Sequence, residues 1–221
     1  MRSLIETTAH NAPRLVAELR AIRADTIHGA AAGDDDPIAI GDAGTAAPTA
    51  PASLPDLATG RPRELTVYYT GREQRLPVSI RQRPLAYLLE GHQLEAANTL
   101  LGLGIEVKRL WSAAVILAEQ MRLVQDDREL EPYEGVYRRH VRVEIDSKLL
   151  AVQPGAFIVP MDQPLANLAI EALEPDGTDS FVCFGLIRPG YQRRLPIYRL
   201  TDPGALSGLR FEVFHESLPP S

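Results

Sequence analysis

The sequence has little cysteine, almost no lysine and no long apolar run. Its one cysteine, Cys183, excludes an internal disulfide and any metal site built from several cysteines. Because Cys183 stands among apolar neighbours, we expect a small buried residue with a raised pKa rather than a nucleophile. No run of about 18 apolar residues occurs, so we expect no membrane span.

Basic charge is also in short supply. The 221 residues carry 23 Lys+Arg against 29 Asp+Glu, a net charge of −6. Nucleic-acid binding needs a basic surface that displaces counterions, so this balance argues against it. Only Lys108 and Lys148 are lysines, which leaves 23 − 2 = 21 arginines. Ala, Pro and Gly are frequent too, and we therefore attribute the arginines to genome composition.

The chain opens with an amphipathic helix and a linker. Apolar residues recur with a helical period over residues 2–27, and Asn11 could cap a new helix where Pro13 interrupts the pattern. Met1-Arg2-Ser3 leads straight into this helix, so we expect no signal peptide, and the compartment stays unknown. Residues 29–63 are dense in Ala, Gly, Pro, Asp and Thr and predict a flexible linker, with one short strand at 37–40.

Residues 64–210 predict an α+β domain. We expect a mixed, mostly antiparallel sheet with two packed helices, preceded by the helix at 1–28 and the linker at 29–63, and followed by a tail at 211–221. A hairpin around Gly71-Arg72 should pair residues 64–70 with 74–80. Other predicted strands cover 86–89, 105–110, 114–125, 137–145, 157–159, 181–187 and 196–200.

The two predicted helices of this domain cover 92–103 and 162–173. In the first, Leu94, Ala97, Leu100 and Leu101 should face inward, and Gly102 and Gly104 should end the helix. Since this helix lies between the strands at 86–89 and 105–110, we expect those strands to form a locally parallel pair. In the strand at 114–125, Val115, Leu117, Met121 and Leu123 share one face.

Three stretches carry a family resemblance. The first runs from Ala156 through Val159-Pro160-Met161-Asp162-Gln163-Pro164-Leu165-Ala166-Asn167 to Glu174-Pro175. The second is Arg83-Pro84-Leu85-Ala86-Tyr87-Leu88-Leu89, a helix, and Gly104–Leu110. The third is Leu195-Pro196-Ile197-Tyr198-Arg199-Leu200. Together they resemble the C-terminal region of large bacterial zinc carboxypeptidases of the carboxypeptidase A class.

The resemblance implies a region downstream of a catalytic domain. The opening helix resembles the last helix of that domain, so a peptidase catalytic domain is the implied partner, and zinc is expected only there. The chain departs from the pattern after Glu174, where Pro175-Asp176-Gly177 stands in place of Pro-Glu-Ser. Asp162 or Gln163 is expected to cap a helix whose first turn contains Pro164, a structural role rather than a ligand role.

One pattern imitates the zinc site of that class. His92-Gln93-Leu94-Glu95 matches His-x-x-Glu, and His215 follows Glu95 by 215 − 95 = 120 positions. We reject a zinc site because the match opens an amphipathic helix and only six residues follow His215, too few to supply the downstream general-base Glu. His10, His28 and His140 have no metal spacing, and His140 alternates outward with Arg138 and Arg142. We expect no catalytic, cofactor-binding or metal-binding residue in this chain.

Three functions remain open at this point. The first is a non-catalytic accessory domain, or a truncated fragment, of a zinc metallocarboxypeptidase, inactive alone. The alternative is a free-standing protein-interaction module without enzymatic activity, which an exposed apolar patch would favour. A small hydrolase that uses His92, Glu95 and His215 is a distant third.

Overall fold

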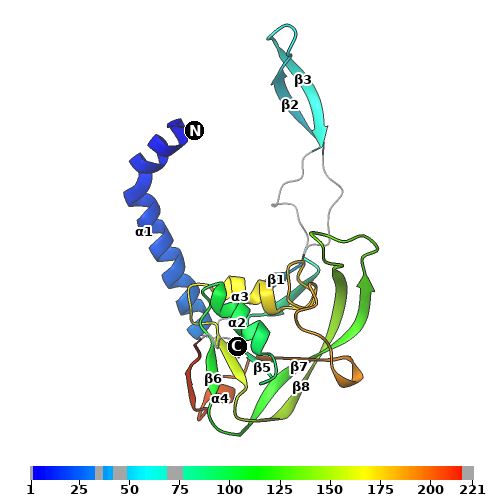
Figure 1. Ribbon diagram of the computed structural model, residues 1–221. Helices are drawn as coiled ribbons and strands as arrows, with labels where there is room; N and C mark the ends of the chain where they lie inside the picture. Colours follow the sequence, from blue (N-terminus) through cyan, green and yellow to red (C-terminus); the bar gives the residue numbers. More distant parts are fainter. Residues whose placement is uncertain (1, 33–36, 42–48, 69–76, 216–221) are drawn as a thin grey trace, which may run out of the picture.

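The computed structural model describes residues 2–32, 37–41, 49–68 and 77–215. In that part of the chain the architecture is α+β, as expected: an N-terminal helix, a two-stranded sheet, a projecting hairpin and a seven-stranded, mostly antiparallel sheet covered by short helices (Figure 1).

Helix α1 (Arg2–Ala32) is continuous, although it contains Pro13. The expected cap at Asn11 is wrong, because the Asn11 side-chain amide donates to the Thr7 carbonyl at 2.8 Å, one turn back within the same helix. The helix projects away from the rest of the molecule, and its C-terminal part approaches α3 (Figure 1). Thr26, Ile27 and Gly29 near this end are half-buried.

Two strands lie inside the expected linker. Strand β1 (Pro37–Ile40), which the sequence predicted, pairs antiparallel with β4 (Ser79–Gln82), and its Ile38 and Ile40 are buried in the main core. The range 37–40 is therefore part of the packed domain, because two isoleucines on one face of a strand contribute more when buried than when hydrated.

The second addition is the hairpin β2 (Thr49–Pro55) and β3 (Pro62–Tyr68), which extends from the domain (Figure 1). The Asp56 carboxylate closes its turn by accepting from the Ala58 and Thr59 amides at 2.9 and 3.0 Å. The predicted pairing of 64–70 with 74–80 is thus wrong: β3 pairs with an earlier segment, and β4 pairs with β1. Gly71-Arg72 lies outside the described residues.

The main sheet has the order β11-β6-β9-β5-β10-β7-β8. Its strands are β5 (Ala86–Leu89), β6 (Lys108–Leu110), β7 (Ala114–Arg128), β8 (Arg139–Val152), β9 (Phe157–Pro160), β10 (Arg194–Leu200) and β11 (Phe211–Val213). Strands β5 and β6 run parallel but do not touch, since β9 lies between them and pairs antiparallel with both. The expected parallel pair is therefore wrong.

Both faces of the sheet centre are covered, so every residue of β5 and β9 is buried. Helices α2 (Leu94–Gly102) and α3 (Ala166–Leu173) cover one face, where Tyr87, Leu89 and Phe157 point. Short helix α4 (Pro203–Leu206) covers the other, where Leu88, Ile158 and Leu200 point. Within α2, Ala97 and Leu100 are buried as expected, whereas Leu94 is 42% exposed and does not face the core.

Where β7 begins and β8 ends, the long hairpin β7–β8 is not covered on the face that α2 and α3 cover elsewhere. Met121 and Leu123 are fully buried, but Val115 and Leu117, expected on the same face, are 69% and 42% exposed because the helical layer does not reach them. The predicted strand at 181–187 is wrong: these residues form turns that pack Phe181, Val182 and Ile187 into the core.

Candidate functional site

The three residues of the zinc-like pattern are not brought together. His92 is exposed, with Nδ1 3.5 Å from a Glu90 carboxylate oxygen, and Glu95 is exposed in the first turn of α2. His215 is exposed just beyond β11. In the ranges that the structure describes, no three His, Cys, Asp or Glu side chains are grouped closely enough to hold a metal ion. The donor set of this chain therefore does not fit a zinc site there.

The other histidines are exposed, whereas the cysteine is buried. His10 and His28 are exposed on α1, and His140 is exposed with Nε2 2.9 Å from Glu129. Cys183 is buried, and this burial raises the pKa of its thiol. A protonated, enclosed thiol is a poor nucleophile, as expected from its neighbours.

Gln163, not Asp162, is the structural residue of the Met-Asp-Gln-Pro run. Neither side chain caps α3, which has Leu165 at its N-cap with no side-chain hydrogen bond. Gln163 instead is buried, and its side chain connects the backbone at Glu106 with that at Pro160. The side-chain carbonyl accepts from the Glu106 amide at 2.7 Å, and the side-chain amide donates to the carbonyls of Glu106 and Pro160. Asp162 is exposed, so the expected cap is wrong, but the structural reading of the run holds for Gln163.

The three stretches that carry the resemblance meet at one buried ion network. Glu174 comes from the first stretch, Tyr87 from the second and Arg199 from the third. The Tyr87 hydroxyl and Arg199 Nε both donate to Glu174 Oε1, at 2.6 and 2.8 Å. Tyr87 and Glu174 are 0% exposed and Arg199 is 2% exposed.

Further charges complete this network. Arg81 on β4 bridges Glu174 Oε2 at 2.6 Å and Asp176 Oδ2 at 2.5 Å. Arg199 also pairs with Glu119 on β7 and donates to the Gln82 carbonyl. Burial works to lower the pKa of Arg199, but Glu174, Tyr87 and Glu119 outweigh it and raise that pKa, so the guanidinium stays charged.

The electrostatics of the other members follow from their burial. Burial and the nearby Glu174 carboxylate raise the pKa of Tyr87 well above its usual value. Burial also raises the pKa of Asp176, against the opposing effect of Arg81. Because its three central side chains are enclosed, the network cannot meet a substrate without unfolding. We interpret it as the polar core that joins β4, β5, β7 and β10 to the end of α3.

Sequence reasoning missed this network, although a signal was available. Arg199 follows the mostly apolar run Leu195–Tyr198 of β10, and Glu174 directly follows the last residue of helix α3. Charged residues at buried positions almost always have a charged partner, so these two could have been paired in advance.

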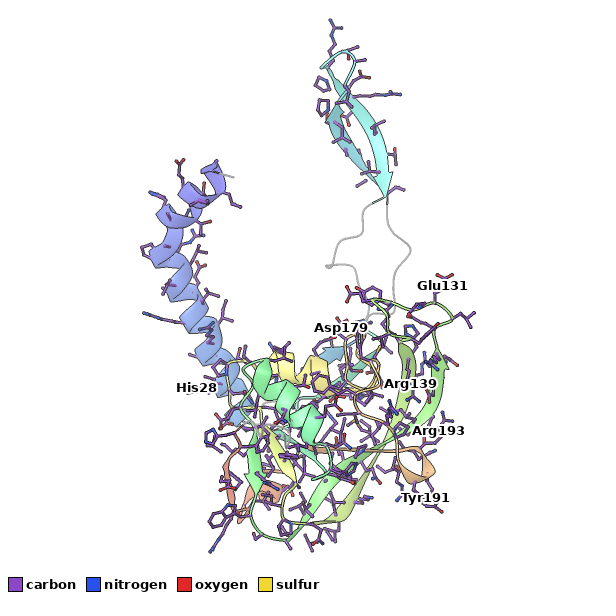
Figure 2. The ribbon with its side chains drawn as sticks, in the orientation of Figure 1. His28, Glu131, Arg139, Asp179, Tyr191 and Arg193 are labelled. Carbon is purple, nitrogen blue, oxygen red and sulfur yellow. The ribbon has the colours of Figure 1, made fainter. Side chains whose placement is uncertain are left out.

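One surface that stays open to a partner is the apolar stripe of α1. At about 100° per residue, the large apolar side chains from Leu4 to Ile22 fall within an arc of roughly 120°. All of them are between 37% and 71% exposed: Leu4, Ile5, Leu15, Val16, Leu19 and Ile22. The stripe therefore has no covering surface in the described part of the chain (Figure 2).

Comparison with known proteins finds fungal carboxypeptidases. The chain is 32% identical over 124 residues to Carboxypeptidase 2 of Trichophyton rubrum, a match that covers 56% of this chain and 23% of the relative. It is 31% identical over 123 residues to Carboxypeptidase 2 of Trichophyton equinum, with the same coverage of 56% and 23%.

The chain thus contains a carboxypeptidase-related region. It spans less than a quarter of the length of these curated relatives, 23% in each. No protein-family model and no solved structure matches it. Among the helices of the described residues, none is long and apolar enough to cross a membrane.

Proposed function

We propose that this chain is a non-catalytic C-terminal accessory domain, or a truncated fragment, of a zinc metallocarboxypeptidase. The observation that carries the proposal is the match to Carboxypeptidase 2, which covers 56% of this chain but only 23% of the relative. The zinc and the catalytic groups then belong to a catalytic domain outside this chain. The scattered positions of His92, Glu95 and His215 support this division.

The exposed stripe of α1 supports a catalytic domain as the partner. A helix of 31 residues with six large apolar side chains on one side is stable in proteins mainly when that side packs on a neighbour. In this proposal the peptidase catalytic domain covers the stripe, while the sheet domain remains attached through the C-terminal end of α1.

The size of the native protein tests the proposal. An antibody raised against residues 77–215 is applied to cells that carry this gene, and immunoprecipitates are assayed for release of C-terminal amino acids. An accessory domain predicts a band well above 24.2 kDa with peptidase activity, and a truncated fragment predicts a 24.2 kDa band without activity. A 24.2 kDa band that itself releases amino acids contradicts the proposal.

A free-standing interaction module is the second candidate. An exposed apolar group favours it, at the end of the β7–β8 pair where β7 begins and β8 ends. Leu117 and Leu149 stand directly opposite each other and are 42% and 73% exposed, beside the exposed Val115. Such an apolar group on a sheet suits a protein partner. The same antibody separates the module from an accessory domain of a longer peptidase, because a module predicts an inactive 24.2 kDa protein. Its abundance and stable folding in the cell distinguish the module from a truncated fragment.

A further inference from the structure

A hollow of about 680 Å³ lies where the β7–β8 hairpin meets the turns that follow α3. Its walls include three arginines, Arg128, Arg139 and Arg188, and two aromatic rings, Tyr137 and Phe184. The volume is within the range of small-molecule sites, about 300–1,000 Å³. Arg139 and the neighbouring Arg193 lie on the hairpin side of the molecule (Figure 2).

One arginine of the hollow is fixed by an acid. Arg139 Nε donates to Asp126 Oδ1 at 2.9 Å, and a second nitrogen of the same guanidinium contacts Asp126 Oδ2. Arg193 approaches the same carboxylate at 3.7 Å. The hydrogen bonds from Arg139 hold the pKa of Asp126 below its usual value. This single carboxylate is thus shared by two arginines and cannot neutralise the others.

The other two arginines keep their charge available. Neither Arg128 nor Arg188 forms an ion pair with any residue in the described ranges. Arg128 stacks over the Tyr137 ring, with its guanidinium carbon 4.8 Å from the ring centre, and Arg188 Nε donates to the Gly185 carbonyl at 3.2 Å. Three lining arginines against one lining aspartate give the hollow a local excess of positive charge, in a chain whose net charge is −6.

We propose that this hollow binds a small molecule that carries an oxyanion, a carboxylate or a phosphate, on a flat apolar body. Guanidinium groups present planar pairs of N–H donors that match both kinds of oxyanion. Arg128 is held by its stack on Tyr137, so little side-chain freedom is lost when it binds. Tyr137 and Phe184 supply the apolar walls for the body of the ligand.

Isothermal titration of the full chain with four probes tests the site: phenyl phosphate, benzoate, inorganic phosphate and phenol. We expect one of the two aromatic anions to bind at least tenfold more tightly than inorganic phosphate, and phenol not to bind. Tighter binding of phenyl phosphate identifies a phosphate ligand, and tighter binding of benzoate identifies a carboxylate ligand.

Variants locate the binding. Arg128→Gln and Arg188→Gln should each weaken the better probe at least fivefold, and Phe184→Leu should weaken it while sparing inorganic phosphate. Arg210→Gln is the matched control, since Arg210 is an exposed arginine next to β11, outside the lining of this hollow, and should leave the affinity unchanged. The proposal is overturned if no anion binds with a Kd below 10 mM, which corresponds to about 2.7 kcal/mol of standard binding free energy. It is also overturned if Arg128→Gln binds the better probe as tightly as the native chain does.

Discussion

Replacing Glu174 by glutamine tests whether the buried ion network stabilises the fold. Glu174 accepts from Tyr87, Arg199 and Arg81 and is fully enclosed. The substitution keeps the shape but removes the central negative charge. Breaking a buried pair by removing one partner costs about 3–5 kcal/mol, because the remaining charge is left uncompensated. We expect the low end, about 3 kcal/mol, since Arg81 keeps Asp176 and Arg199 keeps Glu119.

Urea unfolding followed by far-ultraviolet circular dichroism measures this loss. With a slope of about 2 kcal/mol/M, a loss of 3 kcal/mol lowers the midpoint by about 1.5 M. Fluorescence is a poorer probe because Trp111, the one tryptophan, is 67% exposed. The matched control is Glu144→Gln, whose partner Arg122 lies with it on the surface, and it should cost less than about 1 kcal/mol. If Glu174→Gln unfolds within 1 kcal/mol of the native chain, as the control does, the reasoning is refuted.

Three further outcomes are expected. Leu19→Ala in α1 should change the free energy of unfolding by at most about 0.5 kcal/mol. Deleting residues 1–28 should likewise leave the midpoint of urea unfolding nearly unchanged. A loss of about 2–5 kcal/mol in Leu19→Ala would instead show that the helix packs on the domain. Trace protease should cut the range 29–63 first, at the β2–β3 turn where Leu57 is fully exposed, and first cuts after residue 100 would contradict the domain boundary. Because burial raises the pKa of Asp176, its folded form holds the proton more tightly than the unfolded chain, and the stability from that proton is present at low pH and lost as the pH rises through the folded pKa. The free energy of urea unfolding of Asp176→Asn, relative to that of the native chain, should therefore rise between pH 4 and pH 7. A fall of this difference over the same range would contradict the prediction.

The sequence predicted elements whose signal is local. The period of α1, the short apolar strands β5, β9 and β10, and the buried Cys183 all follow from the residues within each segment. What failed depends on contacts between distant segments. The insertion of β9 between β5 and β6 is decided by partners far apart in the chain, such as Lys108 with Ile158 (158 − 108 = 50) and Ala86 with Pro160 (160 − 86 = 74). No pattern within β5 or β6 records it.

The wrong strand prediction at 181–187 arose because buried residues need not form a strand. Residues 181–187 are apolar because they fill the core beside α3, but Phe181 donates its amide to the Ala172 carbonyl and Gly185 has a positive φ of 75°, which a strand does not permit. Among the candidate residues, His92, Glu95 and His215 lie apart in the described ranges, whereas the arginine-lined hollow combines residues from 126 to 188 and had no signature along the chain.

The most direct test of the accessory-domain account is the zinc content and peptidase activity of the purified chain. Elemental analysis after dialysis against micromolar zinc is combined with release of C-terminal amino acids from blocked dipeptides, with Carboxypeptidase 2 of Trichophyton rubrum as the positive control. The account predicts well under one zinc per chain and no release, with the same values in His92→Ala. One zinc per chain together with amino-acid release, both lost in His92→Ala, would contradict it.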